Sequence, residues 1–216
     1  MHSPHTGRSI RLPASEVLKS IPEIFGIRLN EEPVYNVVEI NSGVEVRRYQ
    51  PAMLASVTVS KEFDDFRHEA FRRLASYIFG ENDGGARLAM TSPVLQEKEI
   101  GEKIPMTAPV LQTGRGSQWT MSFVLPKEFV SKKPPTPLDP TISFQKVEAR
   151  TVAACRYNGN NNQEKMDANR TKLETWLKAY PSYKAVGEIF WAQYDGPFVI
   201  PILKTNEALV EVQGTH

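Results

Sequence analysis

Short stretches in which apolar residues alternate with polar residues occur throughout the chain after residue 33, and this pattern predicts β-strands. The predicted strands cover 35–40, 44–49, 53–59, 119–126, 142–147, 151–157, 188–194 and 208–212. Asn41, Ser42 and Gly43 separate the first two stretches and favour a tight turn. The two strands should therefore form an antiparallel hairpin.

Two longer stretches have the apolar spacing of helices. The first runs from about residue 61 to 79 and is closed by Gly80, and the second runs from 163 to about 180 and is stopped by Pro181. The first helix should turn one face to the core: Phe63, Phe66, Ala70, Leu74, Tyr77 and Ile78. The second carries a single apolar stripe, which indicates a structural role: Met166, Arg170, Leu173, Trp176, Leu177 and Tyr180.

The order of these elements recurs, which indicates a duplication. Residues 46–60 align without gaps to residues 144–158 at an offset of 98, so that Leu54 matches Val152 and Ala55 matches Ala153. Two such units must close on each other to bury their sheet faces. We predict an α+β domain over 33–213, built as a distorted antiparallel β-barrel from a duplicated ββαβ-type unit with two flanking helices. Residues 1–32 are predicted to be a flexible leader with a short helix over 13–25.

A doubled phrase lies between the two units. Residues 86–96 read ARLAMTSPVLQ and residues 102–112 read EKIPMTAPVLQ. Because proline lacks an N–H and cannot sit within a central strand, each copy is predicted to be a short strand that leaves its sheet at the proline. Neither core carries a titratable group, so the phrase is interpreted as scaffold.

Composition narrows the class of protein. The chain has 216 residues, of which 40% are hydrophobic and 24% charged, with a net charge of +1. This near-neutral balance lacks the excess of basic residues that is typical of proteins that bind nucleic acid. The single cysteine excludes an internal disulfide. No apolar run approaches the roughly 18 residues of a transmembrane helix. We expect a soluble, cytoplasmic protein, although a periplasmic or exported precursor is also compatible. The oligomeric state is not indicated.

The outward side of the first helix carries an unusual set of residues: His68, Phe71, Arg72, Ala75 and Phe79. One interpretation is a helix that is half covered by a loop. The other is the wall of a cleft for a flat, apolar and acidic ligand, in which Phe71 and Phe79 supply contact, Ala75 leaves room and Arg72 pairs with a carboxylate. Both interpretations stay open at the level of the sequence.

Few side chains suit metal binding or catalysis. His68 is the only histidine within the predicted domain, so a site of several histidines is excluded, whereas an iron held by a macrocycle needs only one axial ligand. Cys155 alternates with apolar neighbours and is predicted to be inert core. Glu188, Tyr194 and Asp195 could line a polar pocket floor, but no nucleophile–base pair supports an enzyme.

Several separated motifs resemble the SOUL family of haem-binding proteins. They are EVRRYQPA, FRHEAFRRLASYIFGEN, KIPMTAPV, WTMSFVLP and YDGPFVIPILKTNEALVEV, in the order of that family and over about residues 33–212. The resemblance implies the same barrel, shared with bacterial effector-binding domains, and tetrapyrrole binding in an open cleft beside the first helix. Carried onto this sequence, the implied site comprises His68, Phe71, Arg72 and Ala75, with Phe198 and Val199 across from them. Together with Phe79 from the helix pattern, these are the predicted binding residues.

One position departs from the family pattern. Some members ligate iron through a histidine before the tyrosine of an R-x-Y-x-P motif, and Arg48 occupies that position here. Haem or another porphyrin would then bind without an axial protein ligand, or through His68. The sequence thus predicts a non-enzymatic binder or carrier of a tetrapyrrole. The alternatives are an effector-binding barrel for apolar cations, with Glu188 as its acid, or a small-molecule hydrolase.

Overall fold

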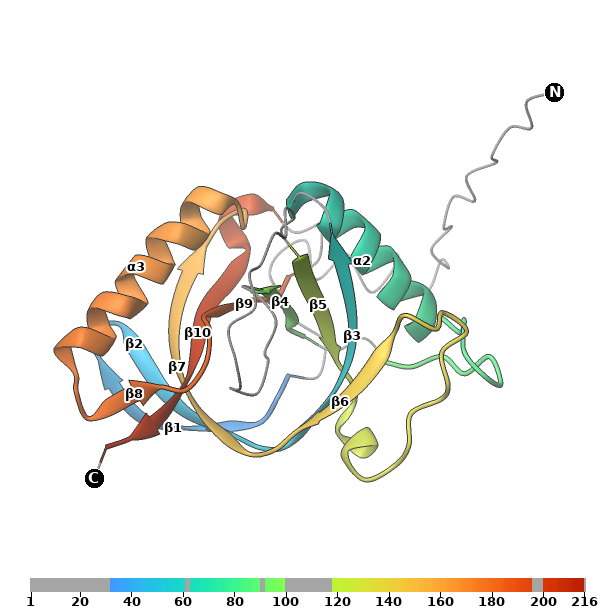
Figure 1. Ribbon diagram of the computed structural model, residues 1–216, viewed down its shortest axis with the longest axis horizontal. Coiled ribbons are helices and arrows are strands. Elements are labelled where there is room, and N and C mark those ends of the chain that lie inside the picture. Colours follow the sequence, from blue (N-terminus) through green and yellow to red (C-terminus); the bar gives the residue numbers. More distant parts are fainter. Residues whose placement is uncertain (1–31, 61–62, 90–91, 100–117, 196–199, 216) are drawn as a thin grey trace, which may run out of the picture.

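The computed structural model describes residues 32–60, 63–89, 92–99, 118–195 and 200–215 (Figure 1). The first half contains β1 (Tyr35–Asn41), β2 (Val44–Tyr49), β3 (Ala52–Ser60), α2 (Phe63–Ile78), β4 (Val94–Glu99), β5 (Gln118–Val124) and the short 3₁₀ helix η1 (Lys127–Val130). The second half contains β6 (Ser143–Val147), β7 (Arg150–Asn158), α3 (Gln163–Ala179), β8 (Tyr183–Ala185), β9 (Phe190–Gln193), η2 (Pro201–Leu203) and β10 (Thr205–Gly214).

The strands form one curled sheet in which every pair is antiparallel. Its order is β1-β2-β7-β10-β9-β4-β5-β3-β6, and β8 pairs with β10. Among the described residues β1 and β6 pair on one side only, so the sheet is an open half-barrel. The two helices lie beside opposite halves of it, α3 next to β7 and β10 and α2 next to β3 and β5 (Figure 1). The predicted fold class is confirmed.

The topology also shows the two repeats. From the junction of β9 and β4 outward, β10 corresponds to β5, β7 to β3 and β2 to β6. The leading strand of each repeat pairs with the other repeat, because β2 lies against β7 and β6 against β3. Equivalent residues share an environment: Ala55 and Ala153 are fully buried under the helices, and Leu54 and Val152 face the opposite side of the sheet. Neither repeat can therefore complete its sheet alone.

The main core lies between the sheet and the helices. α2 turns Phe66, Ala70 and Leu74 fully inward, and the Phe66 ring stacks on Trp119 of β5 at 5.8 Å between centroids. α3 begins at Asn162, whose side chain accepts a hydrogen bond from the Lys165 N–H and so caps the helix. On α3, Met166, Leu173 and Trp176 of the predicted stripe are buried.

One local prediction, the strand of the first phrase copy, was wrong. The strand of the first phrase copy begins after Pro93, at Val94, whereas residues 86–89 form no strand. A proline at the entry to a strand leaves the ladder intact, because the donor it lacks is not needed there. The second copy, 102–112, and the predicted leader helix over 13–25 lie outside the described residues. Strand β8, which is three residues long, was not predicted.

Candidate functional site

The predicted site residues on α2 differ in exposure. His68 and Arg72 are exposed, whereas Phe71 is half-buried with its ring edge-on to Phe123 at 5.5 Å between centroids. Ala75 is only 4% exposed, and Phe79 is half-buried against the main core. A ligand from solvent therefore meets His68, Phe71 and Arg72, which we call the α2 strip, while Ala75 belongs to the packed layer beneath.

Hydrogen bonds tie this part of α2 to the end of β9. Arg67 donates to the side-chain oxygen of Gln193 at 3.4 Å and to the carbonyl oxygen of Asn161 at 3.2 Å. Gln193 in turn donates to the carbonyl oxygen of Asp195 at 3.2 Å. The connection from β9 to β10 thus departs close to α2. The described part of this connection exposes three apolar side chains: Ile200, Ile202 and Leu203. Phe198 and Val199 lie outside the described residues.

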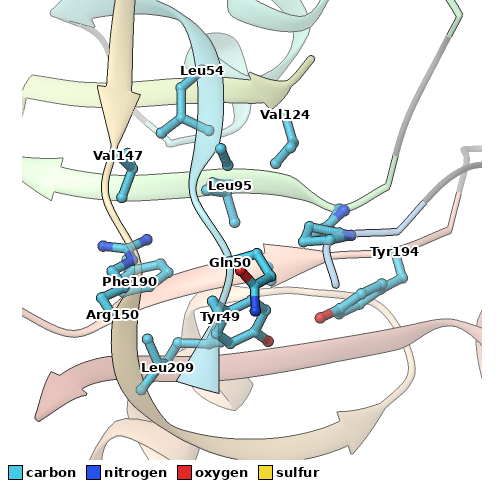
Figure 2. A pocket seen from close by; sticks show the side chains of 15 residues that line it. Tyr49, Gln50, Leu54, Leu95, Val124, Val147, Arg150, Phe190, Tyr194 and Leu209 are labelled. Carbon is cyan, nitrogen blue, oxygen red and sulfur yellow. The ribbon is translucent and has the colours of Figure 1, made fainter. Parts of the chain in front are cut away.

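A second feature lies on the sheet face opposite the helices, which we call the open face. A hollow with about 500 Å³ of free space, mouth included, is lined by residues of β2 to β7, β9 and β10 (Figure 2). Its lining is mostly apolar and includes Leu54, Leu95, Val124, Val147, Val152, Phe190 and Leu209. Four polar side chains join them: Tyr49, Gln50, Arg150 and Tyr194. Figure 2 shows Tyr194 and Tyr49 pointing toward each other, with Arg150 beside Phe190.

A buried ion pair supports one side of this hollow. Arg47 of β2 and Glu207 of β10 are both fully buried and joined by two hydrogen bonds of 2.8 Å. Glu207 also accepts from Arg156 at 3.0 Å and from the Tyr194 hydroxyl at 2.6 Å. Arg47 donates further to the Tyr49 hydroxyl at 3.0 Å. Every formal charge in the pair is thus matched within the fold.

The pKa values of these groups follow from that pairing. Burial alone would raise the pKa of Glu207, but the hydrogen bonds and charge of Arg47 outweigh it and hold the pKa below its usual value. Burial alone would lower the pKa of Arg47, and Glu207 reverses that effect. Burial raises the pKa of Tyr194, as does the negative charge of Glu207. At neutral pH the site therefore holds a guanidinium, a carboxylate and two neutral phenols.

The other chemical candidates are placed as follows. Glu188, the acid expected for an effector pocket, is exposed and does not line the hollow. Tyr194 lines it, whereas Asp195 is buried and accepts a hydrogen bond from the Thr205 N–H. Sequence reasoning missed Glu207. The one available signal was a charged residue at the start of the apolar run ALV in 208–210.

The described residues offer no preformed metal site. They contain no group of three or more histidine, cysteine, aspartate or glutamate side chains placed to hold a metal ion. Cys155 is buried, with its thiol 3.7 Å from the Asn169 side-chain oxygen.

Among the residues that the structure describes, no helix is long and apolar enough to cross a membrane.

Comparison with solved structures finds the same fold in other proteins. The C-terminal domain of EcmrR superposes with a TM-score of 0.56 at 12% identity, covering 84% of this chain and 99% of that domain. An uncharacterized conserved protein from Listeria innocua gives a TM-score of 0.54 at 12% identity, covering 79% of this chain and 92% of that one. At these identities the likeness concerns the fold alone.

Comparison by sequence identifies the family. Heme-binding protein 1 of Mus musculus is 26% identical over 164 residues, which are 76% of this chain and 80% of the mouse protein. The family model described as SOUL heme-binding protein matches residues 30–101 and 95–211. These two segments include β1, α2, the buried ion pair and the first part of β10, up to residue 211. The chain belongs to the SOUL haem-binding family.

Proposed function

We propose that this protein binds or carries haem or a related tetrapyrrole, without catalysing a reaction, on the α2 strip and the adjoining connection from β9 to β10. Family membership is the observation that carries the proposal. The exposed residues of α2 and of the connection support the location.

The residues present suit such a ligand. A macrocycle lying on Phe71 would remove apolar surface from water, and the exposed Ile202 and Leu203 of the connection are further apolar side chains open to solvent. Burial of this kind is the main source of affinity. Arg72 is exposed and can pair with a propionate, whose carboxylate it matches in charge. Haem brings its own iron, and His68 is the side chain of the strip that could ligate it.

Axial ligation is a separate question from binding. Arg48 occupies the position at which some family members carry a histidine, and a guanidinium has no lone pair to offer iron. His68 is exposed and could approach the iron from the α2 strip. Affinity should therefore depend on Phe71 and Arg72, and the spectrum of the complex on His68.

The test is a hemin titration followed by the Soret band and by tryptophan fluorescence. Trp119 stacks on Phe66 of α2, so hemin on α2 should quench its emission. We expect saturable changes at micromolar hemin. Arg72→Gln should weaken binding about fivefold without moving the Soret band, since it removes one partly exposed charge pair. Titrations with no Soret shift and no quenching would refute the proposal.

A further inference from the structure

We propose that the hollow on the open face is a second binding site, and that it accepts a small apolar molecule carrying a carboxylate or a similar anion. This inference does not depend on haem binding, since the hollow and the α2 strip lie on opposite faces of the sheet. It rests on the apolar lining of the hollow, on the internal pairing of the buried Glu207 carboxylate behind that lining, and on the hydrogen-bond donors that remain.

The hollow has the lining of a small-molecule site, because apolar side chains surround a few polar groups. It is open to solvent, and its free space of about 500 Å³ includes the mouth, so a ligand would lie in an open groove. Leu54, Val124 and Val152 come from different strands, and Phe190 closes one side (Figure 2). A flat hydrocarbon group would contact apolar side chains from both repeats.

The carboxylate behind the lining is not available to a cation. Glu207 is 0% exposed and accepts hydrogen bonds from Arg47, Arg156 and Tyr194. Its negative charge is thus matched by one buried and one half-exposed guanidinium. A cation entering the hollow would lose its hydration and gain no free carboxylate, which is unfavourable. The structure therefore argues against the apolar cations expected of an effector-binding barrel.

The donors that face the hollow favour an anion. Arg150 is the one charged side chain among the lining residues. Its guanidinium lies 5.1 Å from the centre of the Phe190 ring and makes only a long 3.4 Å contact with Glu211, which is 40% exposed. That contact is weak beside the 2.8 Å bonds of Arg47, so a ligand carboxylate could replace it.

Tyr49 supplies a second donor. Its hydroxyl oxygen accepts from Arg47, and its own O–H has no acceptor among the described residues. A ligand carboxylate could thus accept hydrogen bonds from the Arg150 guanidinium and from the Tyr49 hydroxyl, and both are charge-assisted because the acceptor is ionised. Bonds to an ionised group are about twice as strong as neutral ones, so the charge of the ligand should decide its affinity.

Three matched probes test this inference on the full chain: 2-naphthoate, 2-naphthamide and 2-naphthylmethylammonium, which share a ring system and differ in charge. Binding is followed by amide chemical shifts in ¹H–¹⁵N spectra. We expect 2-naphthoate to bind about tenfold more tightly than either other probe. The shifts should centre on Gln50, Arg150 and Leu209.

Two variants and one control locate the effect. Arg150→Gln should remove the preference for 2-naphthoate, because it deletes the only lining charge. Ala52→Phe, at a lining position, should fill part of the hollow and weaken binding of all three probes. Arg48→Gln is the matched control: Arg48 is exposed on the neighbouring strand β2 and does not line the hollow. It should leave every affinity within twofold.

Several outcomes would overturn the inference. They are equal affinities for the three probes, tighter binding of the ammonium probe, chemical shifts centred on α2, or no binding of 2-naphthoate at millimolar concentration. A preference unchanged in Arg150→Gln would also overturn it. Hemin binding is measured separately, so failure of either proposal leaves the other standing. Phe71→Asp should abolish hemin binding and leave 2-naphthoate binding unchanged.

Discussion

Replacing Glu207 with glutamine isolates the contribution of the buried ion pair. The substitution keeps the shape of the side chain and removes its charge, so that Arg47 stays fully buried without an anionic partner at its Nη atoms. Glu45, which is 31% exposed, remains on Arg47 Nε at 2.8 Å and compensates only in part. The two Nη groups would meet an amide, one end of which is itself a donor.

The expected loss is large. Breaking a buried ion pair by changing one partner costs about 3–5 kcal/mol, and we expect the lower end because glutamine can still accept one hydrogen bond and Glu45 remains. In urea, with a slope of about 3 kcal/mol per molar, a loss of about 3 kcal/mol lowers the midpoint by about 1 M. The slope itself should not change, since the surface exposed on unfolding is the same.

Equilibrium urea unfolding followed by tryptophan fluorescence measures this change. The matched control is the double variant Arg47→Met and Glu207→Leu, which removes both charges and fills the space with apolar atoms. It should recover most of the lost stability, because replacing both partners spares the uncompensated charge. If Glu207→Gln shifts the midpoint by less than about 0.3 M, or the double variant is the less stable of the two, the reasoning about this pair is refuted.

Three further predictions concern titration and a surface pair. The pKa of Glu207 is lowered in the folded state, so the stability that its carboxylate contributes is present above its ordinary pKa of 4.5 and is lost as pH falls. The urea unfolding midpoint of the wild type should therefore drop between about pH 5 and pH 3 more steeply than that of Glu207→Gln. Burial raises the pKa of Tyr77 to about 12. The stability that the neutral Tyr77 side chain contributes to the fold should be complete below its ordinary pKa of 10 and be lost as pH rises through about 12. An ultraviolet titration of Tyr77→Phe should lack one phenol that titrates late. Arg73 holds Asp139 through bonds of 2.8 and 3.1 Å at 21% and 30% exposure; Asp139→Asn should cost about 0.5–1 kcal/mol in urea unfolding, whereas Glu128→Gln, from a more exposed pair, should cost nothing measurable. Equal effects of these last two substitutions would contradict the role assigned to burial.

Features that depend on local spacing were predictable from the sequence. The inward faces of both helices follow from residues three and four apart, and Phe66, Leu74 and Leu173 are fully buried as expected. The duplication was visible because Leu54 and Val152 occupy matching places in a pattern of period two. The antiparallel class followed from short links between strands.

Features that depend on distant contacts were not predictable. Arg47 and Glu207 are 160 residues apart, and nothing in either neighbourhood indicates that β2 and β10 flank β7. Pro93 was read as the end of a strand because a single sequence does not show on which side of a proline the ladder lies. Glu188 was chosen as the pocket acid from its place near the last strands, but the side a residue faces at a strand end depends on register.

The most direct test of tetrapyrrole binding on the α2 strip is the hemin affinity of Phe71→Asp compared with that of Phe144→Asp. Both rings are half-buried and contact one other ring, Phe123 at 5.5 Å and Tyr77 at 5.7 Å. The two substitutions should therefore destabilise the fold to a similar degree, which thermal melting can check. We predict that Phe71→Asp loses hemin binding by at least about tenfold while Phe144→Asp retains it. Equal hemin affinities in two folded variants would contradict the proposed site.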